Sequence, residues 1–247
     1  MKKFFRTIFA SIIYPRPFIG LFYLPKIFIH WIKFSKMNQG QKLSISDAYP
    51  NLGDWVTTTP FDPHYFYQSS WLSRNLATNM PSKHIDIGSD VKLINAISAF
   101  IPTTFIDFRP LNVELSGLTC LQGDILSLQL PDNSISSLSC LHVVEHIGLG
   151  RYGDRIDPMG SEKALAELGR VVSFGGILFL SVPVGRERIC FNAHRVFATD
   201  TIIKSLPKFK VKSFSLVDDN GQYHYDCSLN ASNELDYGCG MFVMEKC

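Results

Sequence analysis

The fold of this chain is decided by the stretch Ile85-Asp86-Ile87-Gly88-Ser89. An apolar run that stops at a glycine, directly before a helical pattern of apolar residues, predicts a buried strand, a tight turn and a helix. Gly88 would let a ligand approach the backbone closely, and the start of the helix offers free N–H groups to a carboxylate or phosphate. The full GxGxxG pattern is absent, so the turn does not favour a dinucleotide.

Short β-rich runs alternate with helical runs along the rest of the chain. Strands are expected at residues 84–88, 104–108, 118–122, 135–141 and 176–183. Helices are expected at 91–100 and 161–172, the second ended by Gly175-Gly176, and the runs 209–217 and 240–245 suggest a closing antiparallel pair. This order predicts an α/β fold with a parallel sheet covered by helices on both faces.

Charged residues are unevenly distributed along the chain. The 247 residues, 46% of them hydrophobic, are enough for one large domain with an appendage. The net charge of +2 gives no argument for nucleic acid, yet the segment before Asp47 holds eight Lys or Arg residues and no acid. We therefore expect a basic aromatic arm at 1–45, a connecting or lid segment at 46–82 and a ligand-binding domain at 83–247.

The arm suits a segment that lies in the membrane interface, because residues 1–38 combine aromatic and basic side chains without acids. Its uncharged runs are shorter than the roughly 20 residues that span a bilayer, and prolines interrupt them. A signal peptide fits poorly, since Arg16 follows closely and no small-residue cleavage site is present. The alternative is an arm that packs on its own domain or on a second subunit. The expected location is cytoplasmic, peripheral on the inner face of the membrane if the arm binds lipid.

The six cysteines include no CxxC pair, and Cys120 and Cys140 lie in apolar runs where a free cysteine behaves as a small hydrophobe. They are expected to be free thiols in a reducing cytosol.

Polar residues stand where the predicted strands end, and ligands bind beyond the carboxyl ends of strands in an open parallel sheet. Asp107 ends the second strand, where a carboxylate can accept both hydroxyls of a ribose. Asp124 follows the third strand and would face an adenine amino group, with Ile125 against the ring. The alternative for either acid alone is a helix cap or a turn former. Together with Asp86 at the end of the first strand, Asp107 and Asp124 make three acidic residues at successive strand ends, and this favours a ligand site.

These residues resemble a class I S-adenosylmethionine-dependent methyltransferase. The resemblance rests on Asp86-Ile87-Gly88, Asp107, Gly123-Asp124, the turn at 144–147 and the run at 167–171 before Gly175-Gly176. More narrowly, residues 60–246 resemble the domain-of-unknown-function family 268, through YFYQ (65–68), IDFRP (106–110), EHIGLGRYGD (145–154), SVPVGR (181–186), FNAHRVF (191–197) and YGCG (237–240).

The resemblance implies a Rossmann-like sheet of strand order 3-2-1-4-5-7-6 with the last strand antiparallel, S-adenosylmethionine as cofactor, and a role in surface-polysaccharide biosynthesis, without naming a substrate. The expected cofactor contacts are Asp86, Gly88, Ser89, Asp107, Asp124, Ile125 and His142. The first loop has fewer glycines than the usual superfamily turn. Ser89 would have to tolerate the backbone conformation, and Asp90 would repel the cofactor carboxylate.

A cluster of His142, Glu145 and His146 follows the fourth strand at a spacing that, on a helix, places all three on one face. It resembles the metal-binding turn of small-RNA 2′-O-methyltransferases, which implies a divalent cation held by His142, Glu145, His146 and His194. Alternatively the cluster supplies a general base, with His146 or His194 as the base and Glu145 beside it, or it is structural.

Four loop arginines at the same edge would bind a phosphate of a nucleotide- or lipid-linked sugar, unless they are only solvated: Arg151, Arg186, Arg188 and Arg195. The sequence thus predicts O-methylation of a hydroxyl on a sugar or glycan precursor. The alternatives are a metal-dependent RNA 2′-O-methyltransferase, which the mildly acidic second part of the chain disfavours, and a non-catalytic scaffold of the same fold.

Overall fold

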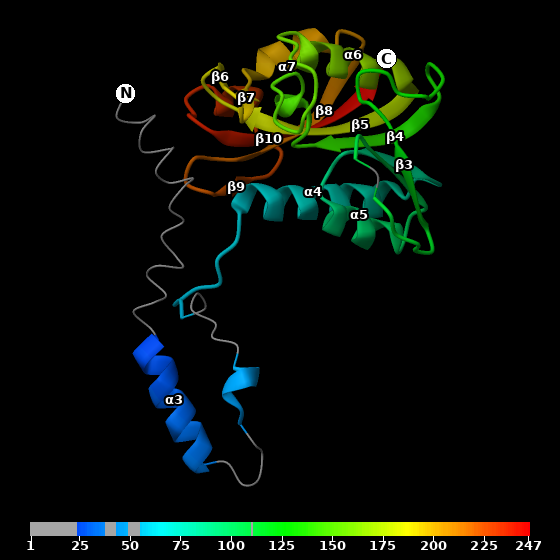
Figure 1. Cartoon of the computed structure of the whole chain (residues 1–247). Helices are drawn as coiled ribbons and strands as arrows, with labels where there is room; N and C mark the ends of the chain where they lie inside the picture. Colours follow the sequence, from blue (N-terminus) through cyan, green and yellow to red (C-terminus); the bar gives the residue numbers. More distant parts are fainter. Residues whose placement is uncertain (1–23, 38–42, 49–54, 110) are drawn as a thin grey trace. The chain divides into compact units, whose positions relative to one another are not determined.

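The computed structural model describes residues 24–37, 43–48, 55–109 and 111–247. The chain divides into two compact units, Met1–Pro60 and Phe61–Cys247. Figure 1 shows the described residues of both units, coloured from blue near the N-terminus to red at the C-terminus. The second unit therefore includes residues 61–82, which the sequence analysis assigns to a connecting segment.

The first unit contains helix α3 (Leu24–Met37) and a 3-10 turn, η1 (Ile45–Asp47). The helix buries none of its residues, and Phe28 and Ile29 are 65% and 62% exposed. The Lys26 ammonium lies 4.2 Å from the centre of the Trp55 ring. The part of the predicted arm before Leu24 lies outside the described residues. No helix in the described ranges is both long enough and apolar enough to cross a bilayer.

The second unit is built on an eight-stranded sheet of order β3-β2-β1-β4-β5-β10-β8-β9. Its strands are β1 (His84–Ile87), β2 (Thr103–Asp107), β3 (Leu118–Gln122), β4 (Ile135–Leu141), β5 (Val172–Val184), β8 (Phe209–Val217), β9 (Tyr223–His224) and β10 (Gly238–Lys246). The first five pair in parallel, and β10 runs antiparallel between β5 and β8. This confirms the predicted order, with β10 and β8 as its seventh and sixth strands.

Helices cover both faces of the sheet, as the sequence predicts (Figure 1). The helices are α4 (Pro63–Asn79), α5 (Val91–Ser98), α6 (Gly160–Val171) and α7 (Thr199–Ser205). Trp71 and Leu72 of α4 pack in one core with Phe179 of the sheet. Leu165 of α6 and Ile202 of α7 belong to the core on the other face. Because both faces are covered, the central strands are apolar on both sides.

The expected end of the second helix at Gly175-Gly176 is wrong. Helix α6 ends at Val171, and strand β5 starts at Val172, so the two glycines lie inside the strand. Gly175 has φ +73°, and a Cβ on Gly176 would lie 2.8 Å from the carbonyl oxygen of Ile135. The register between β4 and β5 shifts beside this point. The two glycines therefore lie at a β-bulge, where glycine is common in strands, and they do not end a helix.

Beyond the predicted elements, the described residues contain a hairpin of β6 (Arg188–Cys190) and β7 (His194–Val196). The hairpin follows β5 and stands at the same edge of the sheet as the polar strand ends, because Val184 at the end of β5 bridges to Phe197.

Candidate functional site

A cavity of about 280 Å³ lies beyond the carboxyl ends of β1, β2, β3 and β4. Five of the seven expected cofactor contacts line it: Gly88, Asp107, Asp124, Ile125 and His142. The structure thus brings together residues from the ends of four successive strands of the parallel sheet, which is where such sheets bind their ligands.

Gly88 and Asp107 face one another in this cavity. Gly88 has φ +68°, a conformation that favours glycine. A Cβ placed there would lie 3.3 Å from the Val143 side chain and 3.5 Å from Asp107 Oδ2. The turn therefore keeps its backbone open toward the carboxylate of the next strand.

Asp86 and Ser89 lie beneath the turn rather than in the cavity lining. Both are buried, and Asp86 accepts hydrogen bonds from the Ser89 amide (3.0 Å) and hydroxyl (2.7 Å) and from the Ser139 hydroxyl. The Ser89 hydroxyl also accepts from the Leu141 amide at 3.0 Å. Burial raises the pKa of Asp86 to about 6, against the opposing effect of these hydrogen bonds. The serine that departs from the usual glycine-rich turn thus ties the turn to β4.

The polar chain continues through His84, which is fully buried on β1. Its ring nitrogens lie 2.8 Å from the hydroxyls of Ser137 and Ser139. Because Ser139 donates its proton to Asp86, it accepts from His84 Nε2, and Nδ1 then accepts from Ser137. Burial lowers the pKa of His84 to about 4, so the ring is neutral near pH 7.

Asp90 caps helix α5. Its carboxylate accepts from the amides of Lys92 (2.7 Å) and Leu93 (3.4 Å). The side chain that was expected to repel a cofactor carboxylate is thus an N-cap, and it occupies helix N–H groups that a ligand would otherwise reach. The part of this turn that stays open toward the cavity is the backbone at Gly88.

Asp107 and Asp124 also shape their own turns. Asp107 Oδ1 accepts from the Arg109 amide at 2.7 Å, and Asp124 Oδ1 accepts from the Leu126 amide at 2.9 Å. Each carboxylate can form its turn and also line the cavity, because Oδ1 accepts the backbone hydrogen bond and Oδ2 is a second acceptor.

The cluster after β4 is a strained residue followed by a single 3-10 turn, not one face of a longer helix. His142 has φ +54°, and η2 spans Val144–His146. The three side chains nevertheless meet: Glu145 Oε1 lies 2.7 Å from His142 Nδ1 and 3.6 Å from His146 Nε2. Glu145 is buried, and its Oε2 makes no hydrogen bond to any described residue.

Burial and neighbouring charges have opposite effects on the pKa values of Glu145 and His142. Burial would raise the pKa of Glu145, but the charge and hydrogen bond of His142 outweigh it and lower that pKa. Burial would likewise lower the pKa of His142, but Cys239 and Glu145 raise it. The pKa values of His146 and His194 are lowered, chiefly by burial, so both rings are neutral near pH 7.

His146 has a defined tautomer. Its Nδ1 lies 2.7 Å from the carbonyl oxygen of Ala193, which can only accept, so Nδ1 carries the proton. Arg151 donates to the same carbonyl at 3.0 Å. His146 Nε2 is then the unprotonated nitrogen of the ring, and Glu145 Oε1 lies 3.6 Å from it.

A compact loop at 147–158 carries Tyr152 into the cavity lining. The Asp154 carboxylate accepts from the amides of Gly148 (2.8 Å), Tyr152 (3.2 Å) and Gly150 (3.3 Å). The Tyr152 ring lies 5.7 Å from His146 and 4.7 Å from the Arg109 guanidinium. Tyr152 was not among the predicted site residues, although it lies in the EHIGLGRYGD run.

The four expected phosphate-binding arginines have different surroundings. Arg195 is buried and donates to the carbonyls of Ile147 (2.7 Å) and Pro158 (3.1 Å), so it holds the 147–158 loop in place. Arg186 and Arg188 each lie 3.5 Å from Asp236, and the Arg186 side chain is 72% exposed. Arg151 contacts the wall of the cavity through Tyr152, 5.2 Å from its guanidinium.

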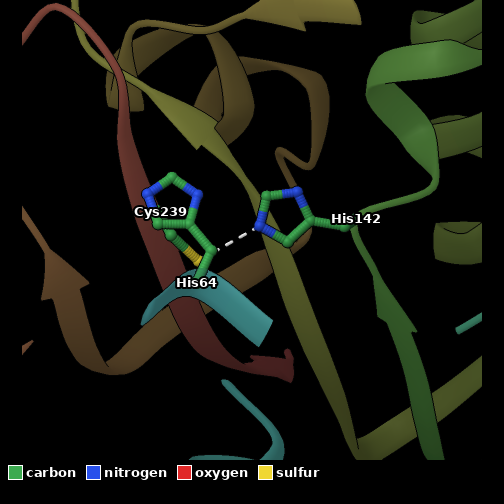
Figure 2. A group of neighbouring side chains, drawn as sticks. All are labelled: His64, His142 and Cys239. Carbon is green, nitrogen blue, oxygen red and sulfur yellow. Dashed lines mark hydrogen bonds between the residues drawn. The ribbon is translucent and has the colours of Figure 1, made fainter. Parts of the chain in front are cut away.

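Further side chains lie around His142 and its neighbour His64. Cys239 Sγ lies 3.3 Å from His142 Nε2, the His64 ring is stacked 5.7 Å from the His142 ring, and Tyr237 lies 5.2 Å from His64. His194 also contacts Tyr237, at 4.9 Å. Figure 2 shows His64, His142 and Cys239 approaching from three different elements. Only weak sequence signals point to His64 and Cys239: His64 precedes the YFYQ run, and Cys239 lies within YGCG.

The strand order and the cavity beyond the strand ends define a class I S-adenosylmethionine-dependent methyltransferase fold. The chain is similar to the N-methyltransferase NodS from Bradyrhizobium japonicum, solved with S-adenosyl-L-homocysteine, at a TM-score of 0.52 and 14% identity over 73% of this chain and 86% of that one. It is also similar to the YcgJ protein from Bacillus subtilis, at a TM-score of 0.50 and 12% identity over 73% and 98%. At such identities the likeness establishes the fold alone.

One family model also matches part of the chain. Residues 129–226 match the family described as Caenorhabditis protein of unknown function, DUF268. The predicted resemblance to this family is therefore confirmed over residues 129–226, and the solved structures add the fold alone. A search of curated proteins gives no match.

Proposed function

We propose that this protein is an S-adenosylmethionine-dependent O-methyltransferase acting on a hydroxyl of a sugar or glycan precursor. One observation carries the proposal: a single cavity joins the open turn at Gly88 and the carboxylate of Asp107 to His146, a neutral imidazole. The first two are suited to a nucleoside with free hydroxyls. The third is suited to removing a proton from an acceptor.

The cofactor would supply a methyl carbon on a positively charged sulfur that leaves as a neutral thioether. The protein then has to align an acceptor oxygen and take its proton. His146 Nε2 would accept that proton, the Ala193 carbonyl holds the Nδ1 proton in place, and Glu145 Oε1, 3.6 Å from Nε2, stabilises the resulting cation. His194, near Tyr237, is the second candidate base.

The acceptor class is proposed from three arginines. Arg151 lies beside His146, while Arg186, between β5 and β6, and Arg188, in β6, lie near Asp236. Guanidinium groups suit the phosphate of a nucleotide- or lipid-linked sugar. Arg195, whose guanidinium already binds backbone carbonyls, would act by holding the loop.

Titration calorimetry with S-adenosylmethionine and S-adenosylhomocysteine tests the cofactor. Both should bind, and Asp107→Ala should weaken both by roughly 10–100-fold, because a hydrogen bond to a charged group contributes about 1.5–3 kcal/mol. Asp200→Ala, which removes an exposed carboxylate of α7, is the matched control and should leave affinity unchanged. Absence of binding by the wild-type protein would favour the scaffold reading instead.

Transfer of a radiolabelled methyl group to nucleotide-linked and lipid-linked sugars tests the acceptor. Incorporation should fall by about 10²–10⁴-fold in His146→Ala with little change in cofactor affinity. Incorporation into RNA but not into sugars would overturn the acceptor assignment.

The first unit supports a proposed association with an anionic membrane surface. On α3, Phe28 and Ile29 are exposed next to Lys26 and Lys33, a combination suited to the interface of a bilayer. Full-length protein should co-sediment with vesicles containing anionic lipid, and the double substitution Phe28→Glu, Ile29→Glu should abolish this. Val91→Glu, at an exposed apolar position of α5, is the control. Equal sedimentation of the double variant and the control would refute the proposal.

A further inference from the structure

Two histidines and a cysteine that are far apart in sequence converge beside the cavity. His64 lies in the first turn of α4, His142 follows β4, and Cys239 lies on β10. Among the described residues, these three each offer a ligand atom within 4.8 Å of the others (Figure 2). His142 and Cys239 are buried and His64 is half-buried. Three elements that meet only in the folded protein thus present one sulfur and two imidazoles to a common point.

The distance between the histidine nitrogen and the cysteine sulfur is compatible with one bound metal ion. A tetrahedral Zn²⁺, bound at about 2.3 Å by sulfur and about 2.0 Å by nitrogen, separates those two atoms by about 3.5 Å. His142 Nε2 and Cys239 Sγ are 3.3 Å apart. A small adjustment of the His64 side chain, which is only half-buried, would complete the set.

Glu145 orients one of these ligands. Its Oε1 lies 2.7 Å from His142 Nδ1, so Nδ1 carries a proton and Nε2 is the nitrogen that faces Cys239, where a metal ion would take the place of any proton on it. A carboxylate that receives the other N–H of a ligating histidine recurs in metal sites, where it fixes the tautomer and makes the imidazole a stronger ligand. The left-handed backbone of His142, at φ +54°, aims the ring at this point.

We propose that His64, His142 and Cys239 bind one Zn²⁺ ion, with a fourth coordination position left for water or for the acceptor. One thiolate and two imidazoles select Zn²⁺ over Mg²⁺, which prefers oxygen. Three protein ligands are typical of zinc sites that keep an open position. The set shares only His142 with the four residues expected from the sequence, and Glu145 acts through His142 rather than as a ligand.

His142 connects this site to the proposed reaction, since it also lines the cavity that holds Gly88 and His146. An acceptor oxygen or sulfur in the open position would lose its proton more readily there. This role of the metal rests on the proposed function, whereas metal binding itself does not.

The same atoms allow a second reading, in which Cys239 is a nucleophile activated by His142 and Glu145. That arrangement uses one imidazole and needs an accessible sulfur. Cys239 is fully buried, and a second imidazole, His64, lies within ligand distance. The metal accounts for all three side chains, and the nucleophile accounts for two.

Titration of the full-length protein with Zn²⁺ against a chromophoric chelator, without S-adenosylmethionine, tests the site. One equivalent should bind, and Co²⁺ in its place should give a thiolate-to-metal absorption band in the near ultraviolet. Cys239→Ser should abolish this band. Glu145→Gln should weaken Zn²⁺ by roughly 10–100-fold, and His64→Ala by more.

Cys247→Ser is the matched control, because Cys247 is an exposed thiol outside the cluster. Near-ultraviolet circular dichroism should show that each variant is folded. His64→Ala keeps the test decisive if the buried Cys239→Ser variant fails to fold. Wild-type affinity in a folded His64→Ala variant, or absence of Zn²⁺ binding by the wild-type protein, would overturn the proposal.

Failure of this site and failure of the proposed function give different results. A protein that binds S-adenosylmethionine but not Zn²⁺ overturns the metal site alone. A protein that binds Zn²⁺ but no cofactor overturns the methyltransferase and leaves the metal site standing.

Discussion

One backbone conformation at His142 assembles much of the site. A non-glycine residue in the left-handed region costs about 1–3 kcal/mol and persists where the surroundings hold it. Here the His142 amide donates to Ser181 at 2.9 Å, while the ring contacts Glu145 and Cys239 at 2.7 and 3.3 Å. Three elements therefore hold the ring at the boundary between the cavity and the histidine–cysteine cluster.

His146 should titrate below its ordinary pKa of 6.5, because burial disfavours its charged form more than Glu145 favours it. Histidine NMR across pH 4–8 would measure this. Glu145→Gln should lower the His146 pKa further, since it removes the carboxylate that stabilises the imidazolium. A His146 pKa above 6.5, or one that rises in Glu145→Gln, would contradict the assigned electrostatics.

The pH dependence of methyl transfer should follow from the same proton. The base must be neutral, so the rate should be constant above pH 6.5 and fall as pH drops through the lowered His146 pKa.

At the scale of elements, the 147–158 loop is held by Asp154 from within and by Arg195 from β7. Gly148→Ala should destabilise the protein by more than the roughly 1–3 kcal/mol of a strained residue, because the new Cβ would lie 2.0 Å from the Asp157 carbonyl oxygen. Gly153→Ala is the control: its φ of +81° matches the +80° of Gly148, but no atom lies within 4 Å of the added Cβ. Urea unfolding would compare them. An equal loss of unfolding free energy in the two variants would show that the Asp157 carbonyl oxygen leaves room for a side chain at position 148.

The strands could be predicted from the sequence because each apolar run is short and bounded by turn residues. The predicted 118–122, 135–141 and 209–217 agree with β3, β4 and β8 to the residue. Gly175-Gly176 was misassigned because glycine serves equally as a helix stop and as a bulge, and only the pairing with β4 distinguishes the two.

The site was predictable where its residues are local and not where they are distant. His142, Glu145 and His146 lie within one turn, so their spacing revealed them. His64 and Cys239 join them only because α4 and β10 pack beside β4 and β5, and no spacing in the sequence encodes that approach. Tyr152 depends on the loop conformation held by Asp154.

At the scale of the whole molecule, two buried groups on β1 should give opposite pH dependences. The folded pKa of His84, about 4, lies below its unfolded value of 6.5, so the unfolded chain protonates first and stability falls as pH drops from 6.5 to about 4. The folded pKa of Asp86, about 6, lies above 3.8, so its contribution rises as pH drops through that window.

Replacement of His84 should separate these effects. The difference in unfolding free energy between wild type and His84→Gln should shrink by about 3 kcal/mol between pH 7 and pH 4, because the variant lacks the group that charges on unfolding. Ser137→Ala keeps the imidazole and should retain the wild-type pH dependence. Urea unfolding at each pH measures both, and a constant difference for His84→Gln would show that the ring is not neutral in the folded protein.

Strand β10 is made after every other strand of the sheet, yet it lies between β5 and β8 in the interior of the sheet. Until it emerges from the ribosome, β5 has an unpaired edge, and the hydrophobic cores on both faces lack its side chains. The nascent chain should therefore stay dependent on chaperones until synthesis has passed Lys246. Cys239 lies on this strand, so the proposed zinc ion would be acquired only after β10 has joined the sheet.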